Sequence, residues 1–129
     1  MALYYRQRSH ALRSAALFDA VINTTDRKIG HLLPTLEGRL FLCDHGVTFH
    51  EEYKLRTVLW QWAGEDLSSE EMAQLQALYS TISETTTELD ELLSHQEIEA
   101  LKERIQDLLN QARFPNPSED WPAIPWPPF

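Results

Sequence analysis

Two matched helix-start signals constrain the fold of this chain more than any other feature. Ser68 and Glu71 fit the S-x-x-E capping box, in which side chains satisfy two backbone N–H groups at the start of a helix. Ser94 and Glu97 fit the same pattern. After the second box, apolar residues recur at helical spacing, at Ile98, Leu101, Ile105, Leu108 and Leu109. The second half is therefore predicted to be helical, with a shorter helix over residues 83–93 between two longer ones.

The first half combines one helix with one hairpin. Residues 9–22, "SHALRSAALFDAVI", have apolar residues on one helical face and Ser9 as the N-cap. Residues 31–44 contain two short apolar runs around "TLEG", which predicts a β-hairpin turning at Gly38. Residues 54–64, "KLRTVLWQWAG", again show helical spacing and predict a further short helix. The predicted fold class is mainly α (α+β) with one small hairpin.

A change in composition divides the chain near residue 114. We expect residues 1–114 to form one helical domain that contains the hairpin. Residues 115–129, "PNPSEDWPAIPWPPF", are rich in proline, which removes backbone donors and favours extended geometry. This segment is predicted to be a strap that packs Trp121, Trp126 and Phe129 onto the helices of the domain.

The charge is distributed unevenly along the chain. The net charge is −9, yet residues 1–58 carry eight Lys and Arg against six Asp and Glu, and residues 59–129 carry three against fourteen. An acidic chain without a basic stripe argues against a nucleic-acid partner, and any phosphate contact is expected in the first half. The sequence also lacks an apolar run long enough to span a membrane. The single cysteine, Cys43, favours a reducing, cytoplasmic setting.

Polar residues with chemical potential gather around the hairpin. The stretch "NTTDRKIGH" places Asp26, Arg27 and Lys28 just before His31, and Asp44 follows the second strand. Because hairpin pairing brings the outer ends of two strands together, His31 and Asp44 are expected to lie side by side as possible metal ligands. Two further histidines, His45 and His50, are candidates to complete a transition-metal site with them.

The run "DRKIGHLLPTLEGRLFLCDHG" resembles the catalytic loop, hairpin and metal-binding triplet of the protein-kinase-like fold. "NTTDR" and "DHG" are similar to the lipid-kinase (phosphatidylinositol 3-/4-kinase-like) and HipA-type branches. "DRKIGH", "DHGVTFH", "KLRTVLWQWAGE" and "PAIPWPP" resemble an uncharacterised bacterial phosphatidylinositol-kinase-like family that is common in actinobacteria. The resemblance implies the helical large lobe of a kinase-like protein, with the small lobe absent from these residues.

The resemblance also implies a role for each polar residue. Asp26 would be the catalytic carboxylate that orients the acceptor, and Lys28 would meet the transferred phosphate. His31 and Asp44 would hold the metal, either Mg²⁺ or Mn²⁺, that accompanies ATP. His31 stands where protein kinases have a metal-binding Asn, and imidazole suits Mn²⁺ better than Mg²⁺. Arg27 would contact the cofactor, although a structural ion pair is an equal alternative for this side chain.

Two alternative functions follow from the resemblance to the kinase-like fold. The first is a divergent phosphotransferase lobe that binds a metal–nucleotide complex, is incomplete without a small lobe, and acts on an acceptor that the sequence does not identify. The second is a non-catalytic, kinase-derived binding or assembly module that self-associates through exposed apolar surface. The expected partners are thus a nucleotide and either a second copy of the chain or a separate small lobe.

Overall fold

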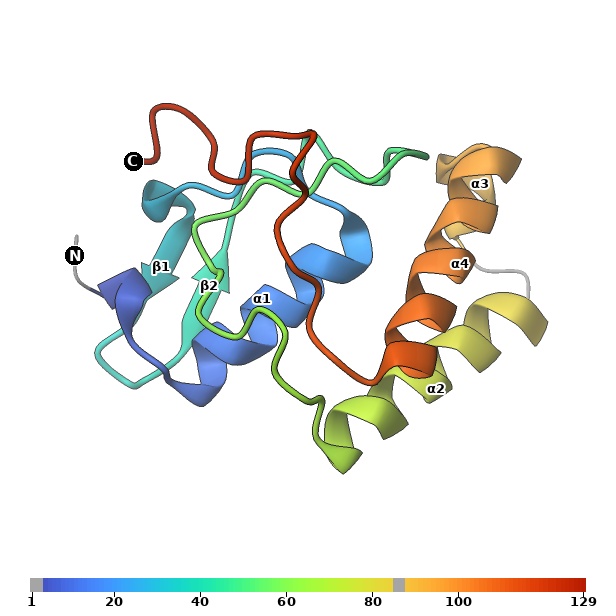
Figure 1. Ribbon diagram of the computed structural model, residues 1–129, viewed down its shortest axis with the longest axis horizontal. Coiled ribbons are helices and arrows are strands. Elements are labelled where there is room, and N and C mark those ends of the chain that lie inside the picture. Colours follow the sequence, from blue (N-terminus) through green and yellow to red (C-terminus); the bar gives the residue numbers. More distant parts are fainter. Residues whose placement is uncertain (1–3, 85–87) are drawn as a thin grey trace.

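The computed structural model describes residues 4–84 and 88–129, which form a mainly helical fold with one small antiparallel hairpin (Figure 1). This confirms the predicted fold class. The elements in chain order are η1 (Tyr4–Arg6), α1 (His10–Ile22), η2 (Ile29–His31), β1 (Leu32–Pro34), β2 (Leu40–Leu42), α2 (Ser69–Glu84), α3 (Leu89–Leu92) and α4 (His95–Gln111). Of the short helix predicted over residues 83–93, residues 85–87 lie outside the described residues, and α3 is a single turn.

Helix α1 begins and ends at residues that the sequence marks as caps. The Ser9 hydroxyl accepts a hydrogen bond from the Leu12 N–H at 3.2 Å, as predicted. The helix ends at Asn23, whose φ of 54° lies in the left-handed region that Asn tolerates better than most residues. One face of the helix is buried in the core, through Leu12, Ala15, Ala16, Leu17, Asp19, Ala20, Val21 and Ile22.

The hairpin presents different faces to the core and to solvent. β1 and β2 pair antiparallel with Leu32 opposite Leu42, and the turn includes Gly38 with a φ of 84°. Leu32 is fully buried. The neighbouring cross-strand pair, Leu33 and Phe41, is exposed on the other face because side chains alternate along a strand. One apolar pair of the hairpin is therefore available to a ligand or partner.

The prediction of a helix over residues 54–64 is wrong. The chain there is irregular because its backbone bonds to other segments: the Arg56 N–H donates to the Thr24 carbonyl at 2.9 Å, and the Val58 N–H to the Arg27 carbonyl at 3.1 Å. The apolar residues that suggested a helix are nevertheless all buried, namely Leu55, Val58, Leu59 and Trp62. The apolar spacing thus correctly indicates which residues are buried. The irregular backbone conformation follows from hydrogen bonds to distant segments of the chain.

Helices α2 and α4 begin at the predicted capping boxes. The Ser68 N–H donates to Glu71 Oε1 at 2.8 Å, and the Glu71 N–H donates to Ser68 Oγ at 3.1 Å. Ser94 and Glu97 repeat this exchange at 2.7 and 3.1 Å. The predicted stripe of α4 faces the core, with Ile98, Leu101, Ile105 and Leu108 buried. Among the described residues, no helix combines the length and apolar character needed to cross a membrane.

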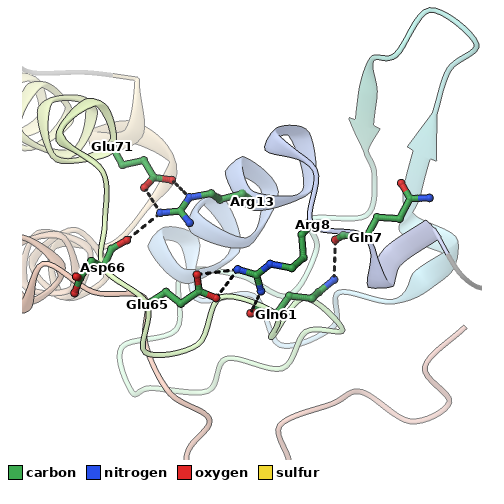
Figure 2. Close-up of polar contacts among 7 residues, drawn as sticks. All are labelled: Gln7, Arg8, Arg13, Gln61, Glu65, Asp66 and Glu71. Carbon is green, nitrogen blue, oxygen red and sulfur yellow. Dashed lines mark hydrogen bonds and ion pairs between the residues drawn. The ribbon is translucent and has the colours of Figure 1, made fainter.

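An ion pair fixes the start of α2 against α1. Figure 2 shows the Arg13 guanidinium donating to both carboxylate oxygens of Glu71, at 2.9 and 2.8 Å, and to the Asp66 carbonyl at 2.9 Å. Burial alone would raise the pKa of Glu71, but hydrogen bonds from Arg13 and Ser68 outweigh it and hold that pKa below its ordinary value. The pair therefore stabilises the junction of the two helices in its charged form.

The segment after α4 runs back across the molecule to the side of the hairpin (Figure 1). The Ala123 carbonyl accepts hydrogen bonds from the Thr57 N–H at 3.0 Å and from Trp60 Nε1 at 2.9 Å. Near the end of the segment, the Pro128 carbonyl accepts from the Ile29 N–H at 2.7 Å. The strap consequently packs on the segment at Thr57 and on the stretch that follows Asp26 and Lys28 of the candidate site.

The aromatic side chains of the strap are placed differently from the prediction. The Trp121 ring lies against Lys54 and Arg56, whose charged groups are 5.1 and 5.3 Å from its centroid. Trp126 and Phe129 are 85% and 78% exposed, so the prediction that they pack on the helices is wrong. Backbone hydrogen bonds and prolines hold this part of the strap, which leaves both rings free to face solvent.

The Arg13–Glu71 pair predicts a specific pH dependence of stability. Glu71→Gln is expected to lower the free energy of unfolding by about 1 to 2 kcal/mol at neutral pH, because partly buried charged hydrogen bonds are stronger than exposed ion pairs. The folded pKa of Glu71 lies below its ordinary value of 4.5. The stabilisation from the pair is therefore fully present above about pH 4.5. It is lost as the pH falls through the pKa that Glu71 has in the folded protein.

Urea unfolding of both proteins from pH 7 down to about pH 3 measures this difference. The stabilities of the wild type and of the variant should converge toward the acid end. A difference that stays constant over the whole range would contradict the assignment of this contribution to the Glu71 carboxylate.

Candidate metal and phosphate site

The loop that follows α1 is fixed at its start by the side chain of Asn23. This amide is fully buried, donates to the carbonyls of His50 and Glu52 at 3.0 and 2.6 Å, and accepts from the Lys54 N–H at 3.0 Å. The Thr25 N–H also donates to the Val47 carbonyl at 3.0 Å. The loop is thereby tied to residues 47–54 before it reaches the candidate site.

Arg27 points into the protein and has no exposed surface. Its Nε lies 3.0 and 3.2 Å from the two carboxylate oxygens of Asp19, which is also fully buried, and its Nη1 donates to the Cys43 carbonyl at 2.9 Å. Burial raises the pKa of Asp19 to about 6, against the opposing effects of the Arg27 charge and a hydrogen bond from Thr57. The structural ion pair that was the alternative role for Arg27 is present. Contact between Arg27 and a cofactor stays a prediction.

The side chains of the two residues that flank Arg27 are partly exposed to solvent, whereas Arg27 itself is buried. Asp26 and Lys28 have side chains that are 33% and 23% exposed, and Lys28 Nζ lies 3.9 Å from Asp26 Oδ1. A carboxylate and an ammonium group thus lie together at the surface of the loop. These are the two residues to which the resemblance assigns contact with the acceptor and with the transferred phosphate.

His31 ends the short helix η2 and faces Asp44, as the hairpin geometry predicted. Its Nδ1 accepts a hydrogen bond from the Lys28 N–H at 3.2 Å, and its Nε2 lies 3.4 Å from Asp44 Oδ2. Since Nδ1 accepts, a neutral ring carries its proton on Nε2, the nitrogen that faces Asp44. His31 therefore places an N–H beside the Asp44 carboxylate in this arrangement.

Asp44 adopts a backbone conformation that is uncommon for residues other than glycine. Its φ is 62°, and its side chain is 55% exposed. Such conformations have a cost and cluster at functional sites, although Asp and Asn adopt them more readily than most residues. The turn brings the Asp44 carboxylate to the loop, so that ligand atoms of Asp26, His31 and Asp44 all lie within 4.8 Å of one another.

This donor set fits a small divalent cation. Two carboxylates supply the oxygen ligands that Mg²⁺ and Mn²⁺ prefer, and imidazole is an additional ligand suited to Mn²⁺. Direct ligation by His31 Nε2 requires the ring proton to move to Nδ1 and the hydrogen bond from Lys28 to break. A purely oxygen-bound cation requires neither change, so the metal-ligand role of His31 stays a prediction.

The other candidate residues near Asp26, His31 and Asp44 do not join this group. In the part of the chain that the structure describes, the possible metal ligands that cluster here include neither His45 nor His50. The His45 ring packs edge-on against Phe18, with centroids 5.7 Å apart. Partial burial, followed by the positive charge of Arg27, lowers the pKa of His45. Cys43 is partly buried, and its backbone rather than its thiol contacts the site through Arg27.

Sequence analysis missed two residues that support the site, Asp19 and Thr57. The Thr57 hydroxyl donates to Asp19 Oδ2 at 3.0 Å, and both residues are buried. A signal for Asp19 was present, because this carboxylate falls on the apolar face of the predicted helix over residues 9–22, where an acid requires a partner. Thr57 carries no comparable signal, since the partner lies 38 positions away in the chain.

Comparison with known proteins gives one informative similarity. No protein-family model matches the chain, and no solved structure matches it. Among curated proteins, the chain is similar to protein Rv2133c of Mycobacterium tuberculosis, with 41% identity over 119 residues. The match covers 92% of this chain and 42% of that relative. The chain thus spans about two fifths of the length of the curated relative it matches.

Proposed function

We propose that this chain is a divergent kinase-like phosphotransferase lobe whose loop and hairpin bind a metal–nucleotide complex. The observation that carries the proposal is the grouping of Asp26, His31 and Asp44 within 4.8 Å, with Lys28 beside Asp26. These residues come from a loop and from both ends of a hairpin, which are the positions that the resemblance assigns to the catalytic apparatus. Geometry and resemblance together support this function.

The chemistry assigned to each residue follows from what phosphoryl transfer needs. The reaction depends mainly on positioning and on electrostatic stabilisation of the transferred group. The Asp26 carboxylate would orient the acceptor hydroxyl and accept its proton, and Lys28 would neutralise the transferred phosphate. Asp44, beside His31, would hold the divalent cation, which when bound neutralises the phosphates of the nucleotide.

The exposed face of the hairpin supplies an apolar surface close to these groups. Leu33 is two residues from His31, and Phe41 is three residues from Asp44; the two side chains are 44% and 54% exposed and oppose each other across the strands. A flat aromatic base would bury this pair. We therefore assign the nucleobase of the bound nucleotide to the Leu33–Phe41 pair.

A second function is supported by a different observation. Several large apolar side chains of the described residues face solvent, among them Leu36, Ile124, Trp126 and Phe129. Such surface is a common mark of association with another chain or domain. A non-catalytic assembly module that self-associates, or that binds a separate small lobe, is therefore the alternative. Because the chain spans 42% of its longer relative, partners of the whole protein remain part of the proposal.

The proposed site predicts stabilisation by a metal–nucleotide complex. Mn²⁺ with ATP should raise the free energy of unfolding by about 2.7 kcal/mol at a concentration one hundred times the dissociation constant. Asp44→Asn should abolish this effect, because it removes the charge while Asn tolerates the left-handed backbone of Asp44. Thermal unfolding with and without Mn²⁺ and ATP measures it. Asp107→Asn, at an exposed position of α4, is the matched control and should behave as the wild type.

The outcomes separate the two functions. Loss of the shift in both variants, or its survival in Asp44→Asn, would exclude Asp44 as the binding group. A wild type that shows no shift at millimolar nucleotide would contradict nucleotide binding by this chain. In that case the assembly module remains, and sedimentation velocity should then show a dimer or a larger species.

The assignment of the nucleobase gives a separate prediction. Phe41→Ser should weaken ATP binding by about tenfold, because it removes an aromatic surface that the base would otherwise cover. It should leave the affinity for Mn²⁺ alone unchanged. Isothermal titration measures both constants. Leu36→Ser, at the fully exposed hairpin turn, is the control and should change neither. Equal effects of the two substitutions on ATP would place the base elsewhere.

A further inference from the structure

We infer that the buried Asp19–Arg27 ion pair, together with Thr57, is a positioning device that sets the Asp26 loop and Asp44 relative to each other. This inference rests on the proposed function, because it concerns the same cation-binding group. It assigns no contact with ligand to these three residues. Their proposed role is to act through the residues next to them.

The first observation is the place of Arg27 between the two accessible residues of the loop. Arg27 is fully buried, whereas Asp26 and Lys28 on either side are partly exposed. Its backbone also pairs with the neighbouring segment, since the Arg27 N–H donates to the Arg56 carbonyl and the Arg27 carbonyl accepts from the Val58 N–H, both at 3.1 Å. The direction of Arg27 therefore fixes the directions of both neighbours.

The second observation is that the same guanidinium reaches the far end of the hairpin. Arg27 Nη1 donates to the carbonyl of Cys43 at 2.9 Å, and Cys43 immediately precedes Asp44. The Cys43 N–H in turn donates to the His31 carbonyl at 3.2 Å. One side chain thus holds the peptide bond from which the left-handed Asp44 projects its carboxylate toward the loop.

The third observation concerns what fixes the guanidinium itself. The Asp19 carboxylate accepts from Arg27 Nε and from the Thr57 hydroxyl at 3.0 Å, and the Thr57 hydroxyl oxygen accepts from the Leu59 N–H at 3.1 Å. Helix α1, the Asp26 loop, the segment at Thr57 and the end of β2 therefore meet in one buried network. Each of these segments approaches from a different part of the sequence.

A buried ion pair fixes the positions of the groups around it more effectively than it stabilises the folded protein. Removing two charges from water costs nearly as much free energy as their attraction returns, so an apolar replacement is often at least as stable. A planar guanidinium that donates to Asp19 through Nε and to the Cys43 carbonyl through Nη1 instead fixes direction, which a flexible apolar side chain does not. We therefore expect substitutions in the network to affect cation binding more than their effect on stability explains.

The test uses mild substitutions and a structural control. Thr57→Val removes both hydrogen bonds of the Thr57 hydroxyl at nearly constant size, and Arg27→Lys keeps the charge but loses the planar, two-sided contact. Arg13→Met breaks the α1–α2 pair shown in Figure 2, which lies outside the network. Mn²⁺ affinity, measured by electron paramagnetic resonance, should fall roughly tenfold in Thr57→Val and in Arg27→Lys, as for other groups that support metal ligands. It should be unchanged in Arg13→Met, although that variant melts at a lower temperature.

A measurement without metal keeps this inference separate from the proposed function. In the metal-free protein, amide exchange at Cys43 and Val58 should become faster in Thr57→Val and Arg27→Lys than in Arg13→Met, because the Val58 amide donates to the Arg27 carbonyl and the Cys43 carbonyl accepts from Arg27 Nη1. If the wild type does not bind Mn²⁺, the proposed function fails and exchange alone decides the inference. Unchanged exchange at these two amides, or a Mn²⁺ affinity that falls equally in Arg13→Met, would overturn it.

Discussion

The arrangement of the candidate site depends on one buried interaction, the ion pair between Asp19 of α1 and Arg27 of the following loop. Both side chains are fully buried, and the guanidinium also binds the Cys43 carbonyl at the end of the hairpin. Without this pair, the loop and the hairpin would be joined mainly by backbone contacts at their edges. Because the pair is directional, it determines which loop residues reach the surface, and these are Asp26 and Lys28.

The parts of the fold that sequence predicts well are those decided by nearby residues. The Ser68–Glu71 capping box, the Ser9 cap and the hairpin turning at Gly38 each depend on hydrogen bonds or torsions within a few positions. The approach of His31 to Asp44 also follows, since hairpin pairing alone brings the two strand ends together. Local chemistry was thus enough for the helices, for the hairpin and for part of the site.

The errors share a cause, which is pairing between distant parts of the chain. Residues 54–64 have the apolar spacing of a helix, but the N–H groups of Arg56, Thr57 and Val58 donate to the Asp26 loop and to the strap. The same long-range pairing hides the role of Thr57. Trp126 and Phe129 face solvent because backbone and proline contacts, rather than their rings, hold the strap. Spacing predicts burial, whereas the partner that a buried residue meets depends on the whole fold.

We propose that the Asp26, His31 and Asp44 group, rather than the acidic surface of the helices, binds a divalent cation. Titrating Mn²⁺ into isotope-labelled protein tests it most directly, because the paramagnetic ion broadens the NMR signals of nearby amides. At substoichiometric Mn²⁺, the signals of residues 26–31 and 43–46 should disappear first, while those of α2 and α4 persist. Broadening that begins on α2 and α4, or that spreads over all acidic residues alike, would contradict the account.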